Sequence, residues 1–140
     1  MPAIHKAILR RLYDEAINQG NFDVIDQIVA PTFVDHHPPA PGLPSGSAGV
    51  KAAFTSFRAA FPDLHLEVED MVTEFDFVFA RYTLTGTHQG EFLGIPATGK
   101  RITISGTDMI RFAQSKVVER WGTQDMLGLL QQLGLAATPA

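Results

Sequence analysis

Apolar residues in the first half of the chain recur every three or four positions, the spacing of one face of a helix. This spacing predicts a helix over residues 3–19, in which one apolar row consists of Ile4, Ile8, Leu12 and Ala16. Asn21 is expected to cap a short second helix that Pro31 ends. A third helix is predicted to begin after Ser45 or Ser47, with an apolar face made of Val50, Phe54, Phe57 and Phe61.

After residue 63 the pattern changes to runs rich in β-branched and aromatic residues with partial alternation, which is typical of strands. A short strand is also expected at residues 32–35, before the proline-rich loop at residues 38–46, and a short amphipathic helix closes the chain before Gly134. The predicted long strands cover residues 64–74, 77–88, 101–112 and 116–123. This order predicts an α+β fold in which a curved antiparallel sheet wraps around the N-terminal helices and leaves an apolar pocket.

The composition adds many aromatic rings to this picture. Ten phenylalanines, against two tyrosines and one tryptophan, are enough both to fill a core and to line a cavity. A length of 140 residues, of which 45% are hydrophobic and 19% charged, fits one globular domain over residues 1–140. The expected ligand is therefore a hydrophobic small molecule.

Charge and cysteine content exclude several function classes. The net charge is −4 and the basic residues are scattered, so we expect no nucleic-acid partner. No apolar run approaches the roughly 20 residues of a membrane span, and charged residues interrupt the N-terminal stretch, so neither a membrane anchor nor a signal peptide is expected. With no cysteine there is no disulfide and no thiolate ligand, which fits a cytoplasmic protein.

Four segments carry a resemblance to a known family. They are Phe-Val-Asp-His at 33–36, Thr-Gly-Thr-His at 85–88 leading to Phe-Leu-Gly-Ile-Pro-Ala-Thr-Gly-Lys at 92–100, Val-Glu-Arg-Trp-Gly-Thr-Gln-Asp at 118–125, and Leu-Gly-Leu-Leu-Gln-Gln-Leu-Gly at 127–134. In these segments the chain resembles the SnoaL-like polyketide cyclases, also called ester cyclases, of the NTF2-like superfamily. The resemblance implies the NTF2-like cone and ring closure by intramolecular aldol condensation without a metal or an organic cofactor.

The resemblance also implies a catalytic acid/base. In the family this residue is an aspartate just after the last strand, and its motif position here is Asp125. One well-placed carboxylate can remove a proton flanked by two carbonyls, and partial burial makes a carboxylate a stronger base. Asp125 also directly precedes the last helix and could instead cap it. The residues alone leave both roles open, and the resemblance favours catalysis.

Histidines supply two further candidates. His36 is expected at the pocket mouth, where it would hydrogen-bond a substrate carbonyl, with His37 facing solvent. His88 either lines the cavity or begins an exposed hairpin. Adjacent histidines on a strand point to opposite faces, and the pairs Asp35/His37 and Asp63/His65 fall short of three or four ligands, so we expect no metal site.

Asp108 shares a strand face with apolar residues, so its carboxylate needs a partner. An ion pair with Arg111 or Arg120 would satisfy it, and a second catalytic acid is the alternative. The expected pocket walls, some of which could equally be plain core, are Tyr13, Phe33, Phe54, Phe57 and Trp121.

Three functions follow from these features. The leading hypothesis is a cofactor-free cyclase or isomerase with Asp125 as acid/base and with His36 and His88 as polar contacts. A non-catalytic binding or dimerisation module is the second. The third is an epoxide hydrolase that activates water, which needs a second carboxylate and an arginine in the cavity; Asp108 and Arg111 lie on opposite faces of a regular strand, which counts against it. A homodimer is expected through an outer sheet face that carries Arg101, Thr103, Ser105 and Thr107.

Overall fold

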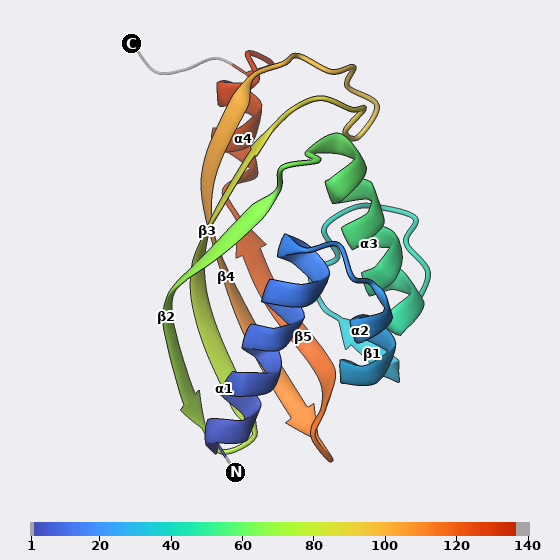
Figure 1. Cartoon of the computed structure of the whole chain (residues 1–140), viewed down its shortest axis with the longest axis vertical. Coiled ribbons are helices and arrows are strands. Elements are labelled where there is room, and N and C mark those ends of the chain that lie inside the picture. The colour runs from blue at the N-terminus through green and yellow to red at the C-terminus, as the bar shows by residue number, and fades with distance from the viewer. Residues whose placement is uncertain (1, 137–140) are drawn as a thin grey trace.

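The computed structural model describes residues 2–136, which form one curved sheet with the N-terminal helices gathered on one side of it (Figure 1). The helical elements are α1 (Pro2–Arg11), the π-helix η1 (Leu12–Asn18), α2 (Asp23–Ile28), α3 (Ser47–Ala60) and α4 (Met126–Gln132). The strands are β1 (Val29–Asp35), β2 (His65–Glu74), β3 (Phe77–Thr87), β4 (Arg101–Ala113) and β5 (Lys116–Gln124). The α+β class and the four long strands are confirmed.

The five strands form one sheet in the order β1-β5-β4-β3-β2. Strands β2 to β5 pair antiparallel, as predicted, whereas β1 pairs with β5 in parallel. Hairpin connections fix the direction of the later strands, but β1 reaches β5 from far along the chain and no turn constrains its direction. This parallel edge places Asp35, the last residue of β1, beside Arg120 of β5.

The helix boundaries differ from prediction at three places. Asn21 does not cap α2, because the cap position is Phe22 and has no side-chain hydrogen bond. Pro31 does not end that helix but lies inside β1, an edge strand that tolerates the missing N–H. Gly46 rather than a serine precedes α3, at a φ of 71°, and a Cβ there would collide with the Pro31 carbonyl oxygen. Because the loop packs closely on β1, position 46 requires glycine.

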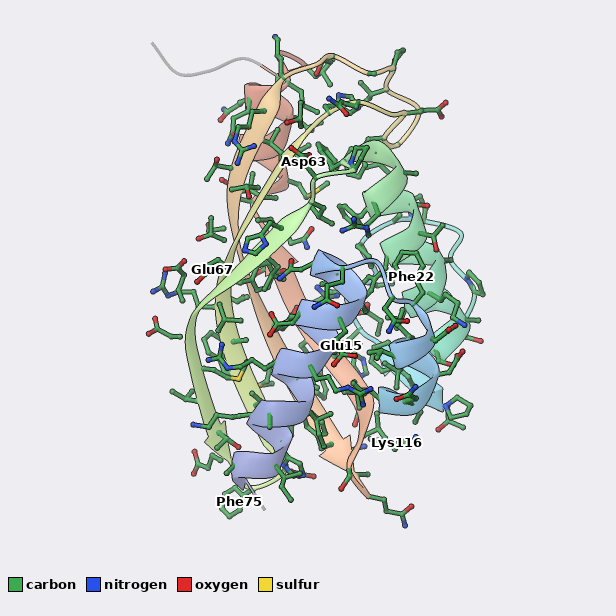
Figure 2. All side chains as sticks on the ribbon, viewed as in Figure 1. Glu15, Phe22, Asp63, Glu67, Phe75 and Lys116 are labelled. Atoms are coloured by element: carbon green, nitrogen blue, oxygen red, sulfur yellow. The ribbon has the colours of Figure 1, made fainter. Side chains whose placement is uncertain are left out.

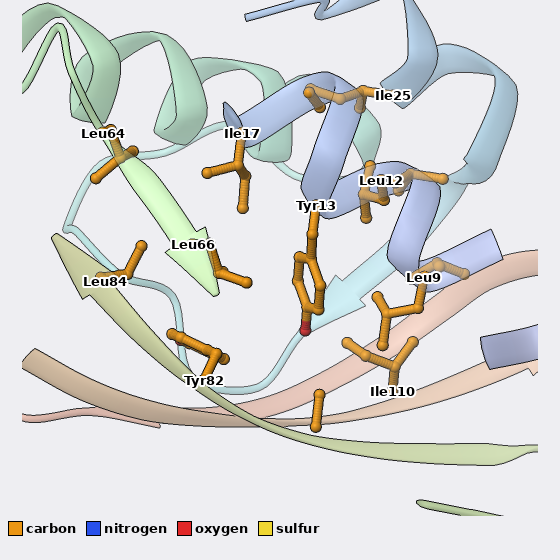
Figure 3. Close-up of a cluster of buried hydrophobic side chains, with 14 of the residues drawn as sticks. Leu9, Leu12, Tyr13, Ile17, Ile25, Leu64, Leu66, Tyr82, Leu84 and Ile110 are labelled. Carbon is orange, nitrogen blue, oxygen red and sulfur yellow. The ribbon is translucent and has the colours of Figure 1, made fainter. Parts of the chain in front are cut away.

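The core lies between the N-terminal helices and one face of the sheet. Alternate residues of β3 and β4 are buried, and the positions between them face outward. Figure 3 shows Tyr13 pointing from η1 towards the sheet, among apolar side chains of the helices and strands. Each fully buried aliphatic or aromatic side chain contributes about 1.5–3 kcal/mol to stability.

The opposite face of the sheet is partly open to solvent. Figure 2 shows Glu67 of β2 and Phe75 of the following turn projecting outward, and Phe75 is 83% exposed. Within residues 2–136 no helix combines the length and the apolar character that crossing a bilayer requires.

Candidate active site

A cavity of about 410 Å³ lies between the helices and the inner face of the sheet. Four of the predicted aromatic walls line it, namely Tyr13, Phe33, Phe54 and Phe57. Trp121 does not: it faces the outer side of the sheet, where its ring stacks on His36 with centroids 4.6 Å apart and planes at 8°. The reason is strand parity, because Trp121 pairs with Met109, which also faces outward.

The proline-rich loop at residues 38–46 forms another wall of the cavity. Its prolines fix the backbone, so the loop presents a rigid apolar surface. Gly49 of α3 holds it in place, because a Cβ on Gly49 would collide with the Pro44 carbonyl oxygen. The loop and helix therefore pack backbone to backbone.

The polar groups of the cavity centre on Asp108 of β4, which is 6% exposed. The hydroxyl of Tyr13 donates to its Oδ2 at 2.7 Å, and Nε of Arg120 donates to its Oδ1 at 2.8 Å. The predicted ion pair is thus confirmed, with Arg120 as the partner. Arg111 lies on the other face and pairs with Glu119.

Arg120 also holds a second carboxylate at the cavity. Its Nη1 donates to both oxygens of Asp35, each at 3.0 Å, and to the backbone carbonyl of His37 at 2.9 Å. Asp35 and Asp108 both line the cavity, so one guanidinium bridges two carboxylates there. Bridging of this kind fixes the position of both acids.

Two glycines make room for these groups on the inner face. Gly122 lies beside Asp108 in the sheet, and a Cβ there would be 2.6 Å from Oδ1 of Asp108 and would collide with Nη2 of Arg120. Gly106 lies between Tyr82 and Gln124, and a Cβ there would be 2.6 Å from the Tyr82 hydroxyl oxygen. Both positions need a residue without a side chain because a neighbour crosses directly over the backbone.

Burial and charge set the protonation of the site. Burial, followed by the Asp108 carboxylate, raises the pKa of Tyr13 well above its usual value, and the same two causes raise the pKa of Tyr82. Burial lowers the pKa of Arg120, but the Asp108 and Asp35 carboxylates outweigh it and raise that pKa overall. Both phenols are therefore neutral at physiological pH, and the guanidinium is always charged.

The structure gives Asp125 the capping role, one of the two left open for it, and not the cavity position that the resemblance favoured. It is the N-cap of α4, where its Oδ1 accepts the backbone N–H of Gly128 at 2.9 Å, and it is not among the residues that line the cavity. Gln124, the last residue of β5, points into the cavity instead. Successive residues of a strand point to opposite sides, so the next residue is directed away.

The two candidate histidines also lie outside the cavity lining. His36 is on the outer face, where Nε2 is 2.8 Å from Glu119. His88 is fully buried, neither lining the cavity nor exposed, and its Nδ1 lies 3.0 Å from the Thr98 hydroxyl and accepts the Thr98 N–H. It holds the loop that follows β3.

The pattern analysis missed Tyr82, Gln124 and the site role of Asp35. The only sequence signal for them is indirect. Gly106 and Gly122 interrupt strands that are otherwise rich in large residues, and an isolated glycine in a strand marks a close approach by another group.

Comparison with known proteins gives consistent results. The family model described as SnoaL-like polyketide cyclase matches residues 7–133. Aklanonic acid methyl ester cyclase DnrD of Streptomyces peucetius is 32% identical over 91% of this chain and 88% of its own length. Nogalonic acid methyl ester cyclase of Streptomyces nogalater is 26% identical over 85% and 90%. The solved structure of TsrD from Streptomyces laurentii is 30% identical and superposes with a TM-score of 0.87 over 96% of this chain and 97% of that one.

Proposed function

Because the chain belongs to the SnoaL-like polyketide cyclase family, we propose that it closes a carbon ring in a hydrophobic, carbonyl-bearing small molecule, with Asp108 as general acid/base. The relatives that are named as cyclases make it an enzyme of this type. A single observation carries the role of Asp108: it is a nearly buried carboxylate in the wall of an apolar cavity.

The proposed reaction is an intramolecular aldol addition, the ring-closing step of an aldol condensation. Asp108 takes a proton from a carbon flanked by two carbonyls, and the electron pair left behind spreads onto a carbonyl oxygen. The nucleophilic carbon then forms a bond to a second carbonyl carbon of the same molecule. The electron pair displaced from that carbonyl settles on its oxygen, which takes up the proton and becomes a hydroxyl group. No atom is gained or lost, so neither an oxidant nor a reductant is required.

The contacts of Asp108 support this role. Tyr13 and Arg120 engage one oxygen each, which holds the carboxylate in one orientation. An ionised carboxylate has about four acceptor positions, so capacity remains for a proton arriving from the cavity. Positioning of this kind favours general-base catalysis, which contributes roughly 10²–10⁴ in rate.

Aklanonic acid methyl ester and nogalonic acid methyl ester are suitable first substrates, because relatives are named for them. Ring closure leaves the mass unchanged, so product is followed by chromatographic retention and NMR. Asp108→Asn should reduce turnover by roughly 10²–10⁴-fold while leaving the fold intact. Asp125→Asn is the matched control and should retain turnover; the opposite result for the two variants would overturn the assignment.

A second candidate reaction is the hydrolysis of an epoxide. It needs two carboxylates and an arginine that converge on the cavity, and Asp35, Arg120 and Asp108 supply this arrangement. One carboxylate would take a proton from water as the water oxygen attacks an epoxide carbon. The other, protonated, would give its proton to the epoxide oxygen as the carbon–oxygen bond breaks. Incubation with styrene oxide tests this reaction, since the diol gains the mass of one water. If a protein preparation that is active in ring closure left the epoxide unchanged, epoxide hydrolysis would be ruled out as the function.

A further inference from the structure

Three residues form a row across the inner face of the sheet next to Asp108. Tyr82 of β3 pairs with Gly106 of β4, which pairs with Gln124 of β5. Because Gly106 has no side chain, the Tyr82 ring lies over β4, and its hydroxyl oxygen reaches Gln124. Both Tyr82 and Gln124 line the cavity.

The direction of the hydrogen bond between them matters. Nε2 of Gln124 donates to the Tyr82 hydroxyl oxygen at 3.1 Å, so this oxygen acts as acceptor. A tyrosine hydroxyl can accept and donate at the same time. Among residues 2–136, no side chain or carbonyl accepts the Tyr82 hydroxyl proton. That proton remains free for a group inside the cavity.

Tyr13 provides the contrast within the same site. Its hydroxyl proton is used, because it donates to Asp108 at 2.7 Å. Tyr82 is 2% exposed, and burial raises its pKa, so its hydroxyl stays protonated. The two buried phenols therefore differ: one orients the carboxylate, and the other offers a donor to a ligand.

We propose that the Tyr82 hydroxyl, held by Gln124, donates a hydrogen bond to a substrate carbonyl oxygen and stabilises the negative charge that develops on it. The ligand class that fits is a ketone, ester or quinone carbonyl on a rigid apolar ring system, because the remaining lining is mostly apolar. The binding part stands on the geometry alone, whereas the catalytic part rests on the proposed function. A donor fixed in place before reaction stabilises developing charge without reorganisation.

The binding part can be tested without turnover. 9-Fluorenone serves as a rigid aromatic ketone, and fluorene is the matched probe that lacks the carbonyl. The native protein should bind fluorenone about tenfold more tightly than fluorene and should lower the carbonyl stretching frequency of bound fluorenone. Tyr82→Phe should lose both effects and keep its affinity for fluorene. A native protein without preference for fluorenone, or a Tyr82→Phe variant that keeps the preference, would overturn the inference.

Gln124→Glu tests the direction of the hydrogen bond. Glutamate is almost the same size but only accepts when ionised, so Tyr82 would donate to it and turn its proton away from the cavity. The variant should therefore lose the preference for fluorenone even though Tyr82 is present. If Tyr82 only filled space, Gln124→Glu would bind both probes as the native protein does, and the proposal would be wrong.

The catalytic part has its own readout. Removal of one donor to a developing oxyanion lowers kcat by about 10²–10³. Tyr82→Phe should therefore slow ring closure by about that factor, with little change in melting temperature. If Asp108→Asn lost turnover and Tyr82→Phe kept it, the catalytic role of Tyr82 would be refuted, whereas the role of Asp108 would stand. Full turnover in Asp108→Asn would refute the assigned base and leave the fluorenone result standing.

Discussion

Nε of Arg120 donates to Oδ1 of Asp108 at 2.8 Å, directly over the backbone of the neighbouring β5 residue, Gly122. Both side chains are largely buried, with 15% and 9% of their side-chain surface exposed. A buried ion pair gives little net stability compared with apolar residues, but the loss of one partner leaves an uncompensated charge. The pair is therefore best explained by the placement of a carboxylate in the cavity.

Arg120→Met should be strongly destabilising, because it leaves both Asp35 and Asp108 without their counter-ion. The expected loss in the free energy of unfolding is about 3–5 kcal/mol, measured by urea denaturation. Arg111→Met is the matched control, since Arg111 makes a more exposed pair with Glu119 and its loss should destabilise the fold much less. Equal losses in the two variants would contradict a special role for the buried pair.

Gly122→Ala should separate Asp108 from Arg120 without removing either group. The new Cβ would be 2.6 Å from Oδ1 of Asp108, so the carboxylate or the guanidinium must move. Misplacement by about 1 Å at a catalytic group can cost on the order of 10²-fold in rate, and we expect a loss of this size in ring closure.

Gly94→Ala is the control for this substitution. Gly94 has a φ of 80°, so alanine strains the backbone there, but nothing lies within 4 Å of its Cβ. The variant should lose some stability and keep its turnover. If Gly122→Ala also kept full turnover, the crowded pair would not be part of the catalytic site.

Most of the fold could be predicted because each long element has a clear period. Alternation along β4 predicted that Asp108 faces the core and needs a partner, which Arg120 supplies. Pairing between distant segments leaves no such local signal, so the parallel contact of β1 with β5, and with it the position of Asp35, was not predicted.

The errors at the site come mainly from the last strand. Strand parity in β5 decides which side chains enter the cavity, and parity there depends on the register with β4. Met109 pairs with Trp121 on the outer face, and Gly106 pairs with Gln124 on the inner face. The register shifts by a bulge between Arg111 and Phe112, which the sequence pattern does not reveal.

Asp125→Ala should affect stability rather than turnover. The Asp125 carboxylate caps α4 through the Gly128 N–H, and loss of an aspartate cap costs about 1 kcal/mol. Thermal denaturation should show this loss, and Asp125→Asn should restore most of it because asparagine caps equally well. If both variants lost ring closure but kept the stability of the native protein, Asp125 would be a catalytic residue after all.

The outer face of the sheet gives the last prediction, the expected homodimer. One apolar row crosses four paired strands in register, and it consists of Val72, Phe79, Met109 and Trp121. Val72 and Phe79 are 60% and 40% exposed. Ion pairs flank the row, Asp70 with Arg81 on one side and Arg111 with Glu119 on the other. Because the charges beside the row are paired, two copies of this acidic chain can bring their apolar rows together with little electrostatic repulsion.

Phe79→Glu should therefore convert a dimer into a monomer, because it puts two like charges into a desolvated contact. The measurement is analytical ultracentrifugation at micromolar concentration. Arg101→Glu is the control, since Arg101 lies on β4 away from the apolar row and, among the described residues, its only ion pair is with Asp63, at 3.6 Å. If Arg101→Glu dissociated the dimer and Phe79→Glu did not, the interface would lie at the polar end of this face and not at the apolar row. A native monomer would refute self-association altogether.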